Sequence, residues 1–188
     1  MQRSFASPVL VLNVKPSGES NREAFFLSED EGIIRATLFG GPKSRLRSHV
    51  SPFNTGLLYT YRDTAKDFRK VTDFDVQSHR PGLRELYERS NAAFYIAKTI
   101  LSGYGGGSSK SEAFYLANAA LDALCEADES CCERIRLYFL WNWAGLLGIR
   151  GDDFNRCVIR LAKFLPANPV YLAKGTGAQQ CVHVPGSP

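Results

Sequence analysis

The stretch from Gly32 to Arg62, GIIRATLFGGPKSRLRSHVSPFNTGLLYTYR, decides the fold. It opens with a mostly apolar run at 32–39, which predicts a strand that Gly40-Gly41-Pro42 ends. It closes with a second such run at 57–61. The segment between these runs is the longest interruption between predicted strands, and it has room for one short helix around 44–50.

Three more predicted strands flank this stretch. They are the runs at 8–14 and 24–27 before it and the run at 69–76 after it. Five short strands suggest a small barrel, and a helix between the third and fourth strands is the layout of an OB-fold. An SH3-like barrel gives a similar strand count, so the count alone leaves both barrels open.

The hydrophobic period becomes helical after about residue 80. The spacing of apolar residues predicts helices over 83–101 and 111–127. A third helix is predicted from Ser130, with Glu133 at capping-box spacing, and Gly148 ends it. Apolar residues surround this third helix on most sides, so we expect it to be the central buried helix.

The predicted fold class is therefore α+β, an N-terminal five-stranded OB-fold β-barrel followed by an α-helical domain. We place the barrel domain at 1–80 and the helical domain at 81–188. The region after Pro166 is rich in Gly, Pro and small polar residues, which indicates loop.

Composition excludes several classes of protein. The chain of 188 residues is 44% hydrophobic and 22% charged, as in an ordinary globular protein. It has no apolar stretch near the ~18–20 residues of a bilayer span and no signal-peptide pattern. The five cysteines are odd in number and form no CxxC pair, which favours a reducing cytoplasm and no membrane partner. Cys125, Cys131 and Cys132 fall in helical patterns as small buried hydrophobes.

Positive charge gathers in the barrel half. Residues 1–80 hold 12 Lys and Arg against 9 Asp and Glu, a net +3 of the total +4, and no acidic residue lies between Glu31 and Asp63. Tyr59 and Tyr61 are two apart on one predicted strand and therefore share a face. Aromatic rings next to a cationic loop are typical of proteins that bind single-stranded nucleic acid. The alternative is that the tyrosines belong to the core and the arginines to a solvated surface.

Sequence signatures of covalent chemistry are missing. There is no G-x-S-x-G or HExxH motif, and the three histidines are far apart in the chain. The Gly-rich segment 103–109 is not a phosphate loop, because Ser109 rather than Gly precedes Lys110. Asp152-Asp153 fits a turn better than a metal site. We predict no catalytic residue, no cofactor and no metal.

Several motifs in sequence order resemble a known family. They are the Gly-Glu-Ser turn at 18–20, the acidic turn that ends at Gly32, the Lys-Ser-Arg at 43–45 and the Pro-Phe at 52–53. The helical segment 136–148 also fits. Over roughly residues 5–150 the chain resembles the bacterial RecO family of DNA repair proteins.

The resemblance implies an OB-fold followed by a helical domain in a non-catalytic protein of the bacterial cytoplasm, associated with the nucleoid. It implies binding of single- and double-stranded DNA, annealing of complementary strands, and work with RecR and single-strand-binding protein to load RecA. A cationic surface would offset the repulsion between two phosphate backbones. The candidate DNA-binding residues are Arg35, Lys43, Arg45, Arg47, Tyr59, Tyr61 and Arg62.

The C-terminal region departs from the family pattern. Many members have four cysteines, as two CxxC pairs that bind zinc, whereas Cys157 and Cys181 each lack the second cysteine. Structural zinc needs about four ligands, so we expect degenerate ligands, no zinc and a shortened, zinc-finger-like tail. A second hypothesis stays open beside DNA binding, a protein–protein adaptor with a packed barrel face and little direct DNA binding.

Overall fold

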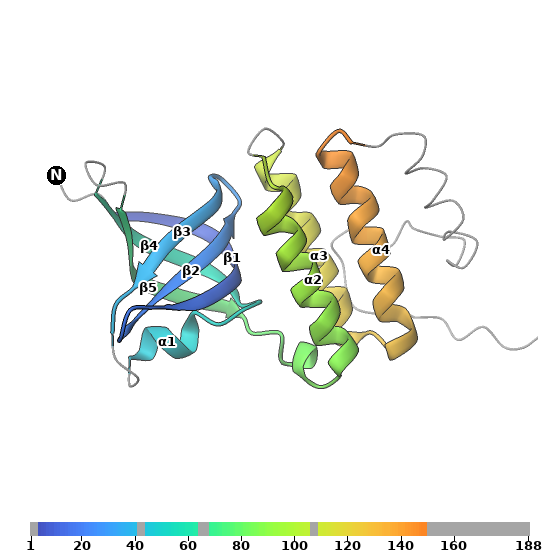
Figure 1. The fold of residues 1–188 in the computed structure, drawn as a ribbon, viewed down its shortest axis with the longest axis horizontal. Helices are drawn as coiled ribbons and strands as arrows, with labels where there is room; N and C mark the ends of the chain where they lie inside the picture. Colours follow the sequence, from blue (N-terminus) through green and yellow to red (C-terminus); the bar gives the residue numbers. More distant parts are fainter. Residues whose placement is uncertain (1–3, 41–43, 64–67, 106–108, 150–188) are drawn as a thin grey trace, which may run out of the picture.

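The computed structural model describes residues 4–40, 44–63, 68–105 and 109–149. In this part of the chain a β-barrel stands beside a bundle of long helices (Figure 1). Lys43, Asp152-Asp153, Cys157 and Cys181, about which the sequence made predictions, lie outside the described residues.

The barrel is closed and has OB-fold connectivity. Its strands are β1 (Ser4–Ser17), β2 (Asn21–Ser28), β3 (Gly32–Leu38), β4 (Thr55–Asp63) and β5 (Phe68–Ser78). They follow one another around the barrel in the order β1-β2-β3-β5-β4, with β3 and β5 parallel and the other pairs antiparallel. A short helix, α1 (Arg45–His49), lies between β3 and β4. The predicted OB-fold is confirmed, and the SH3-like alternative is wrong.

Alternation along the strands builds the barrel interior, because successive side chains of a strand point to opposite faces. The inward-pointing hydrophobic residues include Val9, Val11, Phe26, Ile34, Leu58 and Phe74. Leu46 of α1 packs against this cluster, and Val50, directly after α1, belongs to it. In Figure 1, α1 lies below the strands of the barrel. The apolar residues of the predicted 44–50 helix therefore complete the barrel core.

The helical part begins with a short 3-10 turn, η1 (Pro81–Arg84), which precedes α2 (Tyr87–Gly103) and α3 (Lys110–Glu126). The single helix predicted over 83–101 was wrong at its start. Leu86 has an extended backbone, with φ −127° and ψ 140°, and this separates the turn from α2. The Ser90 hydroxyl donates to the carbonyl of Leu83 over 2.6 Å and holds the turn on the helix.

The last described helix is α4 (Glu129–Leu146), and two predictions about it were wrong. Asp128 is its N-cap residue, so Ser130 lies inside the helix, and Glu133 pairs with Arg136 instead of closing a capping box. α4 is also not the central buried helix. It packs one side on α2 and α3, and most of its other residues are half-buried or exposed.

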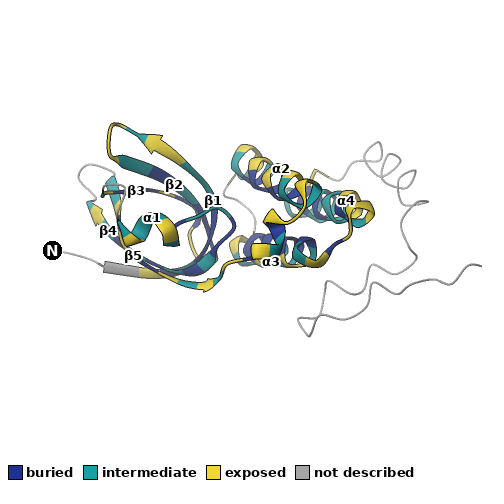
Figure 2. Cartoon of the chain, turned by 90° about the horizontal axis from the view of Figure 1, so that it is seen from below, coloured by how far each residue is buried: buried dark blue, intermediate teal, exposed yellow. Residues whose placement is uncertain are grey.

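The barrel and the helices share one hydrophobic cluster. Leu10, Leu12, Leu27 and Phe53 of the barrel half belong to the same buried cluster as the inner faces of α2, α3 and α4. Figure 2 shows buried residues along β1 next to the helices. Cys132 of α4 is part of this cluster, and Cys125 and Cys131 pack against it as free thiols, as predicted.

Arg80 joins the two parts through its side chain, which is only 4% exposed. Its guanidinium donates to the carbonyl of Phe53 over 2.8 Å and to the hydroxyl of Thr55 over 2.6 Å. It also donates to Asn118 over 2.8 Å and to Asp122 over 2.6 Å, both on α3. One buried side chain therefore fixes the barrel against the helices.

Candidate nucleic-acid interface

The predicted arginines lie on three different elements of the barrel. Arg35 on β3, Arg45 on α1 and Arg62 on β4 have exposed side chains, whereas Arg47 is half-buried. The Nε of Arg47 is buried and has no hydrogen-bond partner within the described residues. Exposed guanidinium groups are available to phosphate oxygens, so Arg35, Arg45 and Arg62 keep the geometry that DNA binding needs.

The two tyrosines lie on the outer surface of the barrel. Leu58 and Thr60 are buried and point into the barrel, while Tyr59 and Tyr61 alternate with them and are half-buried. The reading of these tyrosines as barrel core was therefore wrong. Their surroundings differ, because Tyr59 is paired across β4 and β5 with Asp73 and Tyr61 with Lys70.

A first cavity, which we call the α1 cavity, lies between α1 and the outer surface of β4 and β5. It has a volume of about 490 Å³, and its lining includes Arg45, His49, Tyr59, Asp73 and Asp75. Of the predicted DNA-binding residues, only Arg45 and Tyr59 line this cavity, and two carboxylates, those of Asp73 and Asp75, line it with them. This balance suits a nucleic-acid backbone less well than a purely cationic lining does.

A second cavity, which we call the seam cavity, lies where β3 approaches the beginning of β5. Within the described residues these strands share one paired position, Thr37 with Lys70. The seam cavity has a volume of about 470 Å³ and is lined by Glu23, Glu31, Ile33, Ile34, Arg35, Ala36, Thr37, Arg62, Phe68 and Arg69. Arg35 and Arg62 of the predicted set therefore line one cavity, together with a third arginine, Arg69.

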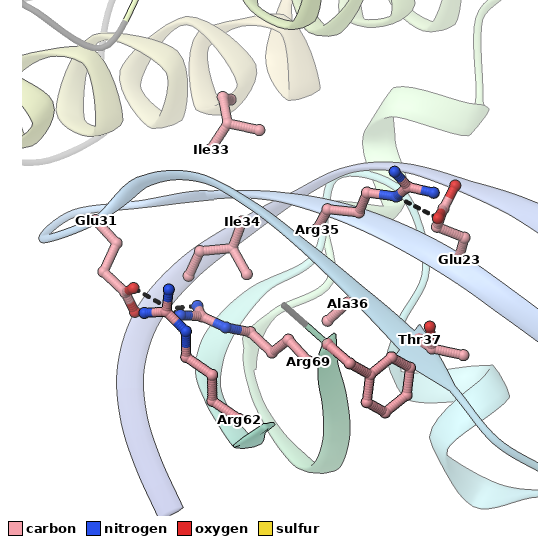
Figure 3. A pocket seen from close by; sticks show the side chains of 10 residues that line it. Glu23, Glu31, Ile33, Ile34, Arg35, Ala36, Thr37, Arg62 and Arg69 are labelled. Carbon is pink, nitrogen blue, oxygen red and sulfur yellow. Dashed lines mark hydrogen bonds and ion pairs between the residues drawn. The ribbon is translucent and has the colours of Figure 1, made fainter. Parts of the chain in front are cut away.

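Figure 3 shows how the arginines of the seam cavity are arranged. Arg69 and Arg62 extend beside Glu31, whereas Arg35 turns away from them toward Glu23. Arg69 donates to both carboxylate oxygens of Glu31, over 3.1 and 2.8 Å. The hydrogen bond from Arg69 holds the pKa of Glu31 below its ordinary value, and the positive charges of Arg69, Arg62 and Lys110 lower it further.

Arg35 is engaged in a bridge across three strands. Glu23 on β2 pairs with Lys15 on β1 over 2.9 Å and with Arg35 on β3. The hydrogen bond from Lys15 is the largest influence that lowers the pKa of Glu23, and Arg35 lowers it further against the opposing effect of burial. Lys15 also lies over the ring of Phe25, 4.9 Å from its centre. Arg35 therefore has a carboxylate partner in the unbound protein.

Sequence reasoning missed the aromatic and basic residues next to the seam cavity. Phe68 and Phe39 meet edge to face, with ring centres 6.0 Å apart, and Lys70 lies over Phe39 at 5.3 Å. The available signal was the Phe68-Arg69-Lys70 triplet, which follows Asp67 and so falls outside the run without acidic residues. Only the pairing of β4 with β5 brings this triplet beside Tyr61 and Arg62.

Two kinds of feature are absent from the described residues. No group of three or more His, Cys, Asp or Glu side chains there is arranged to hold a metal ion. No helix in those ranges is both long and apolar enough to span a bilayer.

A closed five-stranded barrel of this connectivity, with arginines on its surface, defines an OB-fold protein of the nucleic-acid-binding class. Residues 1–79 match the family model described as recombination protein O N terminal. Residues 1–79 therefore carry a recombination protein O N-terminal domain, which implies a role in recombinational DNA repair. A search of curated proteins found no match to the chain.

Proposed function

We propose that the protein binds single- and double-stranded DNA, promotes annealing of complementary strands, and acts with RecR to load RecA onto strands covered by single-strand-binding protein. The observation that carries the proposal is the match of the barrel to the RecO N-terminal domain. We further propose that residues 1–80 provide the DNA-binding part and residues 81–188 a part for protein partners, in the bacterial cytoplasm at the nucleoid.

Electrostatics explain how such a barrel promotes annealing. Two DNA strands repel each other through their phosphates, and cationic side chains that contact both strands reduce this repulsion. Arg45 on α1 and Arg62 on β4 project from different elements of the barrel, so they suit contacts with more than one backbone segment. Annealing makes only base-pair hydrogen bonds and stacking contacts, so it requires no catalytic group and no cofactor.

The outer surface of β4 and β5 supports a role in holding single strands. Tyr61 faces Lys70 across the two strands, so a ring and a cation are neighbours there. Bases stack on such rings while the cation contacts the backbone. Tyr59 faces Asp73, which makes it the weaker of the two stacking candidates.

The test measures binding of a fluorescent single strand over a series of salt concentrations. Changing Lys43, Arg45 and Arg47 together to Glu should weaken binding and make the logarithmic salt dependence shallower by about 0.7 for each lost phosphate contact. Arg134→Glu on α4 is the matched control, because it reverses an exposed charge in the helical part. Loss of annealing should accompany loss of binding. Binding that ignores both salt and the triple change would contradict the proposal.

The adaptor hypothesis has one observation in its favour. Tyr87, Phe94 and Tyr95 on α2 are 77, 52 and 41% exposed, and exposed aromatic residues are common at protein interfaces. The salt experiment separates the two functions, because an adaptor without DNA contacts retains RecR binding but shows no salt-dependent binding of DNA. Substituting Tyr87 and Tyr95 with Ser should then reduce capture of purified RecR and leave DNA binding unchanged.

A further inference from the structure

We propose that the seam cavity is a phosphate-binding subsite for single-stranded DNA, and that Glu31 occupies the place of a backbone phosphate in the unbound protein. The inference rests on the proposed DNA binding and adds to it a residue, Arg69, and a mechanism of competition.

The two arginines of the subsite are direct neighbours. Arg62 on β4 and Arg69 on β5 face each other in the antiparallel pair. Like charges directly opposite on neighbouring strands destabilise a sheet, so this pair needs an anion. Glu31, in the turn between β2 and β3, supplies one carboxylate for two guanidinium groups. The group therefore retains a net positive charge that one further anion can satisfy.

Arg69 holds Glu31 in the geometry that a phosphate also offers. Its two terminal nitrogens donate to the two carboxylate oxygens over 3.1 and 2.8 Å. A phosphodiester presents two free oxygens in a similar fork, and arginine binds both kinds of fork in a bidentate manner. The side chain of Glu31 is 38% exposed, so it can leave into solvent, whereas that of Arg69 is 11% exposed and remains held in the cavity wall.

Aromatic side chains lie next to Arg62 and Arg69, and proteins that bind single-stranded DNA stack bases on such rings. Phe68 lines the seam cavity and contacts Phe39, which is 41% exposed. Lys70 lies over Phe39 and faces Tyr61 across the strands. Asp63 pairs with Phe68 at the end of the β4–β5 pairing and is the acidic residue there. Phe68 thus offers a stacking ring beside a phosphate on Arg62 and Arg69, whereas Tyr61 and Lys70 alternate with these arginines and project from the other face of the two strands.

Removing the competing carboxylate should strengthen DNA binding. We expect Glu31→Gln to bind a short oligothymidine about two- to fivefold more tightly at low salt, the range of one exposed ion pair. Glu133→Gln is the matched control, because it also removes one negative charge from an arginine-paired glutamate, here on α4. It should change affinity by less than Glu31→Gln does.

Removing the arginines should have the opposite effect. Arg69→Gln and Arg62→Gln should each weaken binding and reduce the salt slope by about 0.7. In Arg69→Gln, the further change Glu31→Gln should give no gain, because the competition no longer exists. Thermal melting of every variant checks folding, and Arg62→Lys, which keeps the charge but loses the fork, should have intermediate affinity.

The outcomes separate this inference from the proposed function. Wild-type protein that binds no DNA contradicts both. DNA binding that weakens in the Lys43, Arg45 and Arg47 variant but is equal in Glu31→Gln and Glu133→Gln overturns the inference alone. A gain in Glu31→Gln that persists after loss of Arg69 also overturns it. Competition by inorganic phosphate or ATP as strong as that by the oligonucleotide would assign the subsite to free phosphates instead of DNA.

Discussion

Phe53 and Arg80 are joined by a hydrogen bond, in which the guanidinium of Arg80 donates to the carbonyl oxygen of Phe53 over 2.8 Å. They are also the only non-glycine residues with positive φ within the described residues, at 73° and 47°. Such backbone is unfavourable for side chains with a Cβ and persists only where the surroundings enforce it. The junction between barrel and helices is therefore held by two strained residues that support each other.

We predict that Arg80→Ala lowers the free energy of unfolding by about 3–5 kcal/mol, the range for removing one partner of a buried ionic network. Arg80→Gly loses the same hydrogen bonds but relieves the left-handed backbone. It should therefore be about 1 kcal/mol less destabilising than Arg80→Ala. Urea unfolding followed by tryptophan fluorescence measures both differences.

Arg84→Ala is the control for these variants, because Arg84 is exposed and donates a hydrogen bond to the hydroxyl of Ser51 over 3.0 Å. Its effect should stay within about 0.5 kcal/mol. If Arg80→Ala is no more destabilising than Arg84→Ala, the network around Arg80 does not stabilise the junction.

Gly56→Ala should destabilise the barrel strongly. A Cβ at Gly56 would lie 2.1 Å from the carbonyl oxygen of Asp75, which belongs to the backbone of the neighbouring strand. Because a strand cannot yield as a flexible side chain does, we expect a loss of about 3 kcal/mol, the upper part of the overpacking range. Gly105→Ala, whose Cβ would meet nothing within 4 Å, should be nearly neutral. Thermal melting of the two variants measures the difference.

Glu23 should make stability depend on pH in the acid range. Its pKa in the folded state lies below the ordinary value of 4.5, chiefly because of Lys15. The pairing therefore stabilises the folded protein fully above that value and is lost as the pH falls through the lowered pKa. We expect the difference in Tm between wild type and Glu23→Gln to shrink as the pH is lowered from 7 to 3. A difference that stays constant would show that the charge of Glu23 does not matter.

Cys132 should react slowly with alkylating reagents. Burial raises the pKa of its thiol, and the thiolate is the reactive form. At pH 7.5 we expect iodoacetamide to modify Cys132 more slowly in the folded protein than in urea, because burial lowers both the thiolate fraction and the access of the reagent. Mass spectrometry of tryptic peptides identifies the modified position. Equal rates in both states would place Cys132 at the surface.

Local pattern was sufficient for the barrel. Breaks such as Gly40-Gly41-Pro42 and the apolar runs between them identified five strands and the helix at 44–50, because turn chemistry and strand alternation are properties of neighbouring residues. The start of α2 was not predictable in this way. Leu86 continues the helical spacing, yet its backbone is extended where η1 packs against α2 and α3, and such tertiary packing is not a property of neighbouring residues.

The arrangement of the site depended on pairing between distant strands. Arg62 and Arg69 are separated by a loop in sequence and become opposite neighbours through the register of β4 and β5. No local rule specifies that register, nor the approach of Glu31 from the turn between β2 and β3. Charge counting therefore found Arg35 and Arg62 but not the carboxylate and the second arginine beside them.

The shared cluster of Leu10, Leu12, Leu27 and Phe53 with the helices has a practical consequence. The family match stops at residue 79, which makes that position look like a place to divide the chain. A fragment ending there would leave these four side chains facing water and would be prone to aggregate. The end of the family match is therefore not the end of the unit that folds on its own, because that unit includes the helices that cover these side chains.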